Sequence, residues 1–513
     1  MKKSKKRKIK SEKLAALGTG NPTGSFGRSG VWDWGNLGFE VLVLAVIIGY
    51  CLMVWWPTRY LPYYWDSASF VALGARDLLE RNFNPLVLEA VGSAHQPLYM
   101  VLLALGWKWW GVTRLVAHQV IAPVLPLLMF ATYQLGKRMD SRLVGVTAAF
   151  MVGLMPVVVG AYGVLSVDLL LAGLTTLSLA LYVDNRKIAA MVLLALAVWV
   201  KGTAVLLVPT IVAWEYYNGK LNKQTGYLLA VPVIAILGWF GYHLRVTGWW
   251  MAPPEMPLTW PQNLGQYTTY LIYVVRTELF SHWRWLLTGP AIAAGVWWGM
   301  KKGTKIEELK PVVALLPTIL LVSMWVAARG NYTEANSLMI MPLLVVASLL
   351  IVKQVLIESR AYNWEKGLLI LGVIASLGWL TRWQPQVVPA VAYDFGQRAD
   401  LTYQDMLMVE RQASTFLEIN FPNAKIYGGY PELFELADPF FGYVTTALNV
   451  VPCSQYQPSE ESVILYLHPY HPSQQACRQL LDAMSVTPIQ RFESNGMWVE
   501  MYEGVATGSA QTK

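Results

Sequence analysis

The chain has 513 residues, of which 55% are hydrophobic and only 14% are charged. A soluble globular protein usually carries about 25% charged residues, so this composition excludes an ordinary soluble enzyme. Several apolar runs are long enough to cross roughly 30 Å of hydrocarbon. The sequence therefore predicts a polytopic α-helical membrane protein.

The net charge of +8 is concentrated at the N-terminus, where eight of the first thirteen residues are Lys or Arg. A basic cluster before a first apolar segment marks the cytoplasmic side and attracts anionic lipid. A nucleic-acid-binding arm is the alternative, but nothing downstream supports it. Residues 1–36 are predicted to be a basic, flexible cytoplasmic tail, and the following apolar run a retained anchor rather than a cleaved signal peptide.

The positions of Lys and Arg between the apolar runs predict the topology. If Pro97–Gly111 crossed the membrane, the basic KRMDSR segment and every later basic loop would lie outside. If this run is an interfacial helix in the first outer loop, all basic loops are cytoplasmic, as the positive-inside rule requires. The run Ile188–Trp214 is too long for one span and splits at Lys201-Gly202 into two short helices. The prediction is about 11 transmembrane helices with an extracytoplasmic C-terminus: Leu37–Pro57, Leu115–Gly136, Leu143–Ala161, Leu169–Val183, the two halves of Ile188–Trp214, Tyr227–Leu244, Leu286–Met300, Val312–Ala328, Ser337–Val352 and Leu368–Trp383.

A long aromatic loop is predicted outside the membrane between Arg245 and Trp285. It either rests on the membrane or forms a lid, with Glu255 and His282 as candidate contacts for a ligand. Residues 37–383 are then the transmembrane domain.

From about Gln384 the composition becomes that of a soluble domain, so residues 384–513 are predicted to be a small extracytoplasmic α/β domain. The segments AKIYGGY, SVILYLH and MWVEMYE are typical of strands, and ESNGMW carries the Asn-Gly turn signal of a hairpin. Helices are predicted at Leu401–Phe416 and Ser473–Met484. Cys453 and Cys477 both fall in this domain, and the sequence leaves open whether they pair.

Unusual ionisable residues collect on the outer side of this topology. Asp66 lies among aromatic residues just after the first span, Asp168 lies at the head of the fourth span, and Lys201 is flanked by apolar residues. Ionisable groups at such depth are costly and are candidates for function. Each has a structural alternative, because either aspartate could cap a helix and Lys201 could extend to the lipid headgroups.

Sugar transfer from a polyprenyl-phosphate donor suits this set of residues. The leaving group is a lipid phosphate, which is already a good anion, so one carboxylate suffices as the general base for the acceptor hydroxyl. Cations such as Lys201, Arg329 or His95 would hold the phosphate and stabilise its developing charge. A divalent metal ion between the two carboxylates stays an open alternative, but the sequence offers too few further ligands to predict one.

Four features in order resemble a known family: Asp66 after the first span, HQPLYMVLLALGWKWWGVTRLVAHQV, KRMDSRLVGVTAAFMVGLMPVVVGAYGVLSVDLLLAGLTTLSLALY and WVKGTAVLLVP. Together they are similar to the GT-C membrane glycosyltransferases related to protein O-mannosyltransferases and lipid A aminoarabinose transferases. The resemblance covers Trp55 to Pro209. It implies that Asp66 is the catalytic base and that Asp168, His95 and Lys201 are site residues.

Three positions depart from the pattern of that family. Asp66-Ser67 stands where members often have Asp-Glu, His95-Gln96-Pro97 replaces His-Pro-Pro, and Val167 precedes Asp168 in place of Pro or Thr. No charge needed for the mechanism is lost, but donor and acceptor identity cannot be transferred from a relative.

The sequence thus predicts an inverting glycosyltransferase of the GT-C type in the plasma membrane, acting on its extracytoplasmic face. Its expected partners are a polyprenyl-phosphate-linked sugar, a glycan, lipid or protein acceptor and membrane lipids, with no nucleic acid and no required cofactor. The alternatives are a lipid or polysaccharide transporter and a non-catalytic membrane scaffold. The predicted roles are catalysis for Asp66 and Asp168, phosphate binding for His95, Lys201 and Arg329, and acceptor or lid contacts for Glu255 and His282.

Overall fold

The computed structural model describes residues 34–64, 67–87, 96–250, 261–300, 309–329, 334–359, 363–380, 401, 403–429, 432–457, 462–468, 474–484 and 486–504. Residues 1–46 and residues 47–513 form two compact units. Of the first unit, the structure describes only the beginning of α2 (Trp34–Thr58), a 25-residue apolar helix. The remaining elements belong to the second unit.

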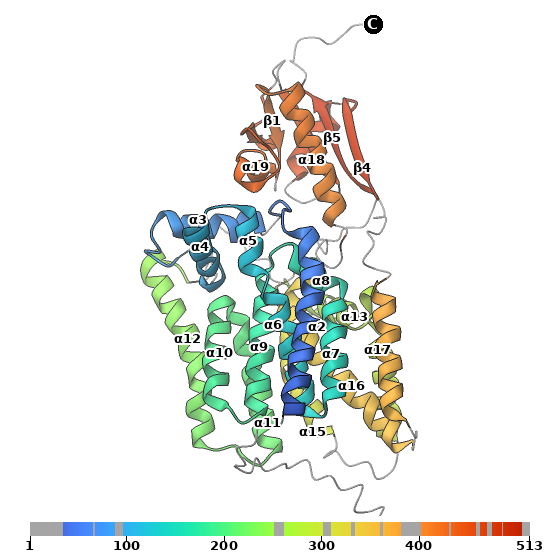
Figure 1. Ribbon diagram of the computed structural model, residues 1–513. Helices are drawn as coiled ribbons and strands as arrows, with labels where there is room; N and C mark the ends of the chain where they lie inside the picture. Colours follow the sequence, from blue (N-terminus) through green and yellow to red (C-terminus); the bar gives the residue numbers. More distant parts are fainter. Residues whose placement is uncertain are drawn as a thin grey trace, which may run out of the picture. The chain divides into compact units, whose positions relative to one another are not determined.

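The second unit contains a bundle of mostly apolar helices, drawn in Figure 1 from blue through green to yellow. In chain order its helices after α2 are the π-helix η1 (Ser67–Ala72), α3 (Leu73–Glu80), α4 (Leu98–Trp110), α5 (Arg114–Ile121), α6 (Val124–Met139), α7 (Arg142–Leu154), α8 (Pro156–Gly163), α9 (Val167–Val183), α10 (Lys187–Val200), η3 (Gly202–Leu207), α11 (Val208–Tyr217), α12 (Lys223–Thr247), α13 (Leu264–Phe280), η4 (Ser281–Trp283), α14 (Trp285–Met300), α15 (Lys310–Ala328), η6 (Glu334–Ile340), α16 (Met341–Glu358) and α17 (Trp364–Leu380).

Several of these helices are long and apolar enough to cross a membrane, which makes the chain an integral membrane protein. Helices α7 and α8 are bent by 58° at their junction, because Pro156 begins α8 and has no N–H with which to continue the ladder of α7. Helices α9 and α10 are apolar but shorter. Among the described residues, five segments pass by length and composition, or six if α7 and α8 count as one broken span: Leu37–Thr58, Arg114–Met139, Lys223–Thr247, Lys310–Ala328 and Asn336–Glu358.

Glycines let α6 and α7 approach each other backbone to backbone. A Cβ on Gly136 of α6 would lie 2.8 Å from the Cα of Gly145 on α7. A Cβ on Gly145 would lie 2.4 Å from the carbonyl oxygen of Tyr133. Small residues favour such close packing where no hydrophobic effect drives helices together in lipid. Helix α6 also packs against α9, and α9 against α10.

The predicted short helix at Pro97–Gly111 is confirmed as α4, which has 13 residues. At about 1.5 Å per residue it is about 20 Å long, shorter than the hydrocarbon core. It packs against α3 and α5, and the indole N–H of Trp107 donates to the carbonyl of Thr113 (3.1 Å) at the turn into α5. Its interfacial position stays a prediction.

The predicted aromatic loop between Arg245 and Trp285 is wrong in its second half. Residues Leu264–Phe280 form α13, a 17-residue helix. Asn263 caps this helix by accepting a hydrogen bond from the backbone N–H of Gln266 (2.9 Å), a common role of Asn at a helix start. Helix α13 packs against α15, so tertiary contacts stabilise a helix that contains charged residues and no long apolar run.

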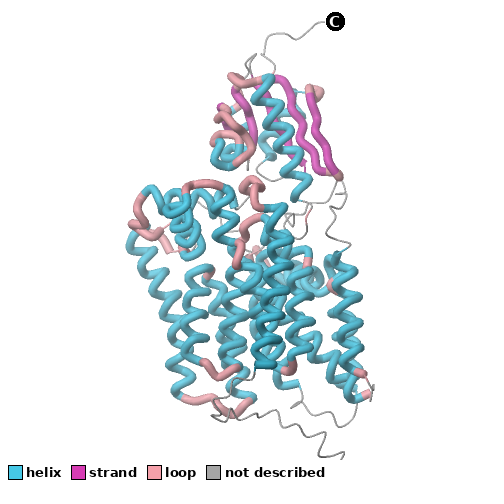
Figure 2. Tube along the Cα trace, in the orientation of Figure 1, coloured by secondary structure: helices cyan, strands magenta, loops and turns pink. Residues whose placement is uncertain are grey.

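The C-terminal part of the chain folds into a mixed five-stranded sheet with the order β2-β1-β3-β5-β4, shown in magenta in Figure 2. Strand β1 pairs in parallel with β2 and β3, whereas β5 is antiparallel to β3 and β4. Helix α18 packs against β4 and β5, and α20 against β3. The elements are α18 (Tyr403–Asn420), β1 (Lys425–Gly428), α19 (Glu432–Glu435), η7 (Pro439–Phe441), β2 (Asn449–Pro452), η8 (Cys453–Gln455), β3 (Ser462–His468), α20 (Gln475–Met484), β4 (Gln490–Ser494) and β5 (Met497–Glu503).

The three predicted strands and both predicted helices of this domain are confirmed as β1, β3, β5, α18 and α20. The hairpin between β4 and β5 turns at Asn495 and Gly496, whose φ angles are +47° and +83°, as an Asn-Gly hairpin turn requires. Cys453 and Cys477 form a disulfide inside a hydrophobic cluster with Tyr427 and Ile464. The pairing that the sequence left open is therefore present. The domain boundaries near residues 36 and 383 stay predictions.

Candidate functional site

Asp168 and Lys201 form a buried ion pair at one end of the α9–α10 hairpin. Asp168 is the second residue of α9, which Ser166 caps by accepting a hydrogen bond from the Asp168 N–H (3.3 Å). Lys201 directly follows α10, and its Nζ lies 2.6 Å from Asp168 Oδ1. The side chain of Asp168 is 9% exposed and that of Lys201 is 15% exposed. The positive end of the α9 dipole also favours the carboxylate, so the structure holds both charges away from solvent without leaving either uncompensated.

Two amide side chains that the sequence did not single out complete this cluster. Lys201 Nζ lies 3.4 Å from Asn336 Oδ1 in η6. Gln96 Oε1 accepts a hydrogen bond from the N–H of Gly202 (2.9 Å). A Cβ on Gly202 would lie 3.2 Å from Gln96 Nε2 and 2.8 Å from Ile236 Cδ1, so glycine permits the close approach. The sequence signal that could have identified these two residues is their position. Gln96 directly follows the predicted site residue His95, and Asn336 directly precedes the predicted span Ser337–Val352.

The segment that follows Asp66 is tied to the turn that precedes Asp168. The hydroxyl of the buried Ser67 donates to the carbonyl of Val164, in the connection between α8 and α9. The next carbonyl in this connection, that of Leu165, accepts a hydrogen bond from the Tyr99 hydroxyl (2.8 Å). The turn that leads into α9 is therefore held from both η1 and α4. It brings the chain at Ser67 next to the chain that carries Asp168.

A second buried polar group extends the cluster toward α13. Glu278 accepts hydrogen bonds from the hydroxyls of Ser323 and Ser337, both at 2.5 Å. Ser337 directly follows Asn336, so this group continues the cluster around Lys201. Arg284, which is 2% exposed, donates to the carbonyls of Thr277 (2.9 Å) and Ser281 (3.1 Å) and so closes the turn between α13 and α14.

Of the other five predicted site residues, the structure describes two, His282 and Arg329. Asp66, His95 and Glu255 lie outside the described residues. His282 is half-buried in η4 with a φ of +48°, and Arg329 is the exposed C-cap of α15. The structure thus brings together Asp168 and Lys201, and the roles of all seven residues stay predictions.

Two i,i+4 ion pairs lie along α3 and its C-cap. Arg81 Nε donates to Asp77 Oδ1 (2.9 Å), and Arg76 Nε lies 3.9 Å from Glu80 Oε1. Arg76 also makes a contact that the sequence could not show, because its Nη1 lies 2.6 Å from Oδ2 of Asp438 in the C-terminal domain.

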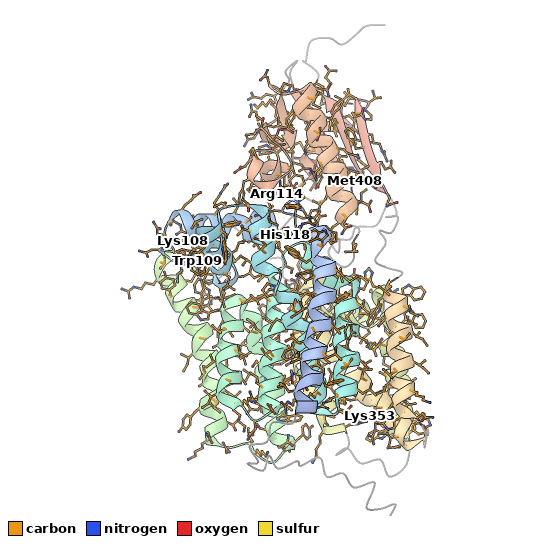
Figure 3. The ribbon with its side chains drawn as sticks, in the orientation of Figure 1. Lys108, Trp109, Arg114, His118, Lys353 and Met408 are labelled. Atoms are coloured by element: carbon orange, nitrogen blue, oxygen red, sulfur yellow. A yellow bond between two sulfur atoms is a disulfide. The ribbon has the colours of Figure 1, made fainter. Side chains whose placement is uncertain are left out.

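Further ion pairs lie at the opposite end of the α9–α10 hairpin. Asp184, just after α9, pairs with Arg138 at 2.7 Å, and Lys187, at the start of α10, pairs with Glu215 at 2.9 Å. The 17 residues of α9 separate this end from Asp168 by about 25 Å. Lys353, which pairs with Asp140, also lies at the end of the bundle away from Arg114 and His118 (Figure 3).

The Asp168–Lys201 cluster offers a fixed carboxylate and an ammonium. Nζ of lysine carries three N–H donors, and Asp168 and Asn336 use two of them in the part of the chain that the structure describes. The third can bind an anion. Within the described ranges, no group of three or more His, Cys, Asp or Glu side chains is arranged to hold a metal ion.

No protein-family model matches the chain. A curated relative, alpha-(1->6)-mannopyranosyltransferase A of Mycobacterium tuberculosis (strain ATCC 25618 / H37Rv), is 29% identical over 201 residues. The match covers 34% of this chain and 37% of the relative, so the chain spans well under half of the length of that protein.

Two solved structures of ArnT from Cupriavidus metallidurans share the fold of the chain. The structure bound to undecaprenyl phosphate has a TM-score of 0.51 at 13% identity and covers 92% of this chain and 98% of its own. The apo structure has a TM-score of 0.50 at 13% identity and covers 91% and 98%. At this identity the likeness shows the fold, and it includes both the helical bundle and the C-terminal domain.

Proposed function

We propose that this chain, which has the fold of the GT-C membrane glycosyltransferases, transfers a sugar from a polyprenyl-phosphate donor to an acceptor hydroxyl. One observation carries the proposal. On this fold, Ser67, one residue after Asp66, is hydrogen-bonded to the turn that leads into α9, and α9 carries Asp168 in its buried pair with Lys201. A carboxylate and a held cation are the two groups that this reaction needs.

The proposed topology has eleven spans, a cytoplasmic N-terminus and an extracytoplasmic site. The disulfide between Cys453 and Cys477 supports it, because disulfides persist in oxidising compartments outside the cytoplasm. The positions of the ion pairs also support it. Arg138, Lys187 and Lys353 lie at the end of the bundle that the positive-inside rule assigns to the cytoplasm.

The proposed reaction is an inverting displacement. The acceptor oxygen attacks the anomeric carbon as the bond from that carbon to the phosphate oxygen breaks, and the electron pair leaves with the lipid phosphate. Asp66 takes the proton of the acceptor hydroxyl. Lys201, oriented by Asp168, donates its third N–H to the phosphate and stabilises the charge that develops there. His95 and Arg329 are proposed as further phosphate contacts.

Asp168 has a second proposed role as the group that orients the acceptor or donor sugar, since Lys201 binds its Oδ1 and a carboxylate has a second acceptor oxygen. Glu255 and His282 stay candidates for acceptor contacts. The proposal makes no use of a metal ion. The match to part of the mannosyltransferase relative supports sugar transfer in general. The identity of the sugar and of the acceptor is left to experiment.

The test uses the full-length protein, purified in detergent, with polyprenyl-phosphate sugars and a panel of glycan, lipid and peptide acceptors. Wild type is compared with Asp66→Asn, Asp168→Asn and a matched control, Asp140→Asn, which removes a paired carboxylate at the far end of the bundle. Loss of a general base lowers turnover about 10²–10⁴-fold, so Asp66→Asn should fall in this range while Asp140→Asn stays close to wild type.

Three outcomes would overturn the proposal. Full turnover by Asp66→Asn would remove the base assignment. Absence of transfer by folded wild-type protein from every donor would favour a scaffold, and movement of the donor lipid across a reconstituted bilayer without transfer would favour a transporter.

A further inference from the structure

A short segment of the C-terminal domain packs against the membrane domain at Tyr63, three residues before the candidate base Asp66. This docking segment, Asp438–Tyr443, contains η7 and ends its turn at Gly442, whose φ is +95°. Asp438 caps η7 by accepting a hydrogen bond from the Phe440 N–H (2.9 Å). The segment therefore has a defined conformation of its own, with one carboxylate oxygen of Asp438 left for another partner.

Both backbone polar groups of Tyr63 bind the docking segment. The Tyr63 N–H donates to the carbonyl of Phe441 (3.1 Å). The hydroxyl of Tyr443 donates to the carbonyl of Tyr63 (3.0 Å). Tyr63 is 1% exposed, so water cannot replace these bonds without opening the contact. The C-terminal domain thus holds the backbone three residues before Asp66.

Aromatic packing fixes the side chain of Tyr63 in the same place. Its ring centroid lies 5.3 Å from that of Phe440 and 6.5 Å from that of Trp107 on α4. Phe440 and Trp107 contact each other edge to face at 5.5 Å. Such pairs add to the stabilisation from buried area. Phe440 of the docking segment therefore packs against both Tyr63 and Trp107 of the membrane domain.

Two arginines of the membrane domain anchor the docking segment. Arg76 on α3 pairs with Asp438 at 2.6 Å, and its guanidinium lies 4.8 Å from the ring centroid of Phe440. Arg114 on α5 donates to the carbonyl of Gly442 (3.3 Å). Burial raises the pKa of Asp438, but hydrogen bonds from Arg76 and the Phe440 N–H, with the charge of Arg76, hold it below its usual value. The carboxylate is therefore ionised at neutral pH.

The chain after Asp66 is anchored independently. The N–H and hydroxyl of Ser67 both donate to the carbonyl of Tyr64 (3.0 and 2.7 Å), and the hydroxyl also reaches Val164. Tyr64 in turn packs against Tyr403 of α18, with ring centroids 5.8 Å apart. Of the described residues nearest to Asp66, Tyr63 and Tyr64 are thus held by the C-terminal domain, and Ser67 is held by the α8–α9 connection.

We propose that the docking segment is a positioning element that sets the place of Asp66 relative to the Asp168–Lys201 pair. The inference rests on the proposed function, because it assigns Asp66 the role of base. A base must lie within hydrogen-bond reach of the proton that it removes. A displacement of about 1 Å lowers turnover about 100-fold, so loosening Tyr63 should lower kcat without removing any group that binds the donor.

The test uses the full chain with Tyr443→Phe, which removes the hydrogen bond to Tyr63 and keeps the ring, and with Arg76→Gln, which removes the cation that pairs with Asp438. Arg76→Lys is the rescue variant. Arg491→Gln is the matched control, since it removes a cation of the C-terminal domain whose ion-pair partners among the described residues, Glu493 and Glu500, lie on β4 and β5 and not in the docking segment. We expect kcat per folded molecule to fall roughly 10- to 100-fold in the first two variants, with KM for the donor nearly unchanged and partial recovery in Arg76→Lys.

A second readout does not depend on activity. Hydrogen exchange of the peptide that contains Tyr63 to Ala68 should become roughly fivefold faster in Tyr443→Phe, as loss of one hydrogen bond predicts, and should stay unchanged in Arg491→Gln. Faster exchange with unchanged kcat would overturn the positioning role, as would wild-type exchange in both variants. Faster exchange in a protein that transfers no sugar from any donor would show that the proposed function has failed and not the contact.

Discussion

Replacement of Lys201 by Met should destabilise the protein more than any surface charge change. Asp168 would remain 9% exposed with its cation removed. At the observed 2.6 Å and an effective dielectric constant of about 20, the attraction amounts to about 6 kcal/mol. Part of it offsets the desolvation of the two charges. Removal of one partner of a buried pair typically costs about 3–5 kcal/mol, and this is the expected loss in free energy of unfolding.

The assay is a titration of the detergent-solubilised protein with a denaturing detergent, followed by the fluorescence of its 23 tryptophans. The double variant Asp168→Asn/Lys201→Met should recover most of the loss, because no uncompensated charge remains. Lys187→Met is the matched control, since Lys187 pairs at 2.9 Å with Glu215, whose side chain is 2% exposed. It should lose similar stability but keep its transfer rate per folded molecule.

The reasoning would be refuted by a Lys201→Met variant that loses less than about 1 kcal/mol, the value of an exposed pair. It would also be refuted by a double variant as unstable as the single one, because the cost would then come from packing and not from charge.

Three further predictions concern the C-terminal domain and the topology. Burial raises the pKa of Glu432 to about 8, against 4.5 for its ordinary value. Between these two pH values the folded domain binds a proton that the unfolded chain releases. The free energy of unfolding should therefore fall as pH rises from 4.5 to 8, by at most about 1.4 kcal/mol per pH unit. Thermal unfolding of Glu432→Gln at pH 6 and 8 should show a weaker dependence, with a remainder from the neighbouring Glu410, whose pKa burial also raises; an unchanged slope would contradict the assignment. Replacing both Cys453 and Cys477 by Ala removes a link across 24 residues and should cost about 3 kcal/mol, which chemical unfolding measures, and equal stability would contradict it. A reporter fused after Arg138 should signal cytoplasm, and an external signal would overturn the proposed orientation.

The sequence could predict the members of the central ion pair but not the pairing itself. Asp168 and Lys201 stand out because an ionisable residue among apolar ones is rare and costly in a membrane. Their contact depends on how the antiparallel helices α9 and α10 align with each other. This alignment brings Lys201 Nζ to 2.6 Å from Asp168 Oδ1, although the two residues are 33 positions apart. No local pattern contains that register.

Neutral polar groups are the main part of the site that the sequence did not reveal. Asn336 and Ser337 carry no charge, so nothing in a charge-based topology distinguishes them from other residues at a span end. The hydrogen bonds that Glu278 accepts from Ser323 and Ser337 come from two other helices, so its own segment of the sequence does not show them. Helix α13, which carries Glu278, was missed for the same reason, because packing against α15 and not an apolar run stabilises it.

In the soluble domain the failure is of a different kind. Strand β2 has four residues, ends in Pro452 and lies at the edge of the sheet. Its strand character comes from pairing with β1, and strand propensity depends strongly on such context. The Asn-Gly hairpin at Asn495 could be predicted because its backbone requirement is local.

The candidate groups share a position that follows from the solvent of a membrane protein. Asp168 lies in the first turn of α9, Lys201 directly follows α10, and Ser67 begins η1. A charge in the middle of an apolar helix would lie in hydrocarbon, whereas a helix end can reach the interface. At a helix end, however, the backbone is no longer fixed by the i→i−4 ladder. Each of these ends is accordingly held by a neighbour: Ser166 caps α9, Gln96 binds Gly202, and Val164 accepts from Ser67. Tyr63, in the chain before Asp66, meets the same requirement, because the C-terminal domain binds both of its backbone polar groups. Under the proposed function, this contact gives the C-terminal domain its part in positioning the carboxylate of Asp66.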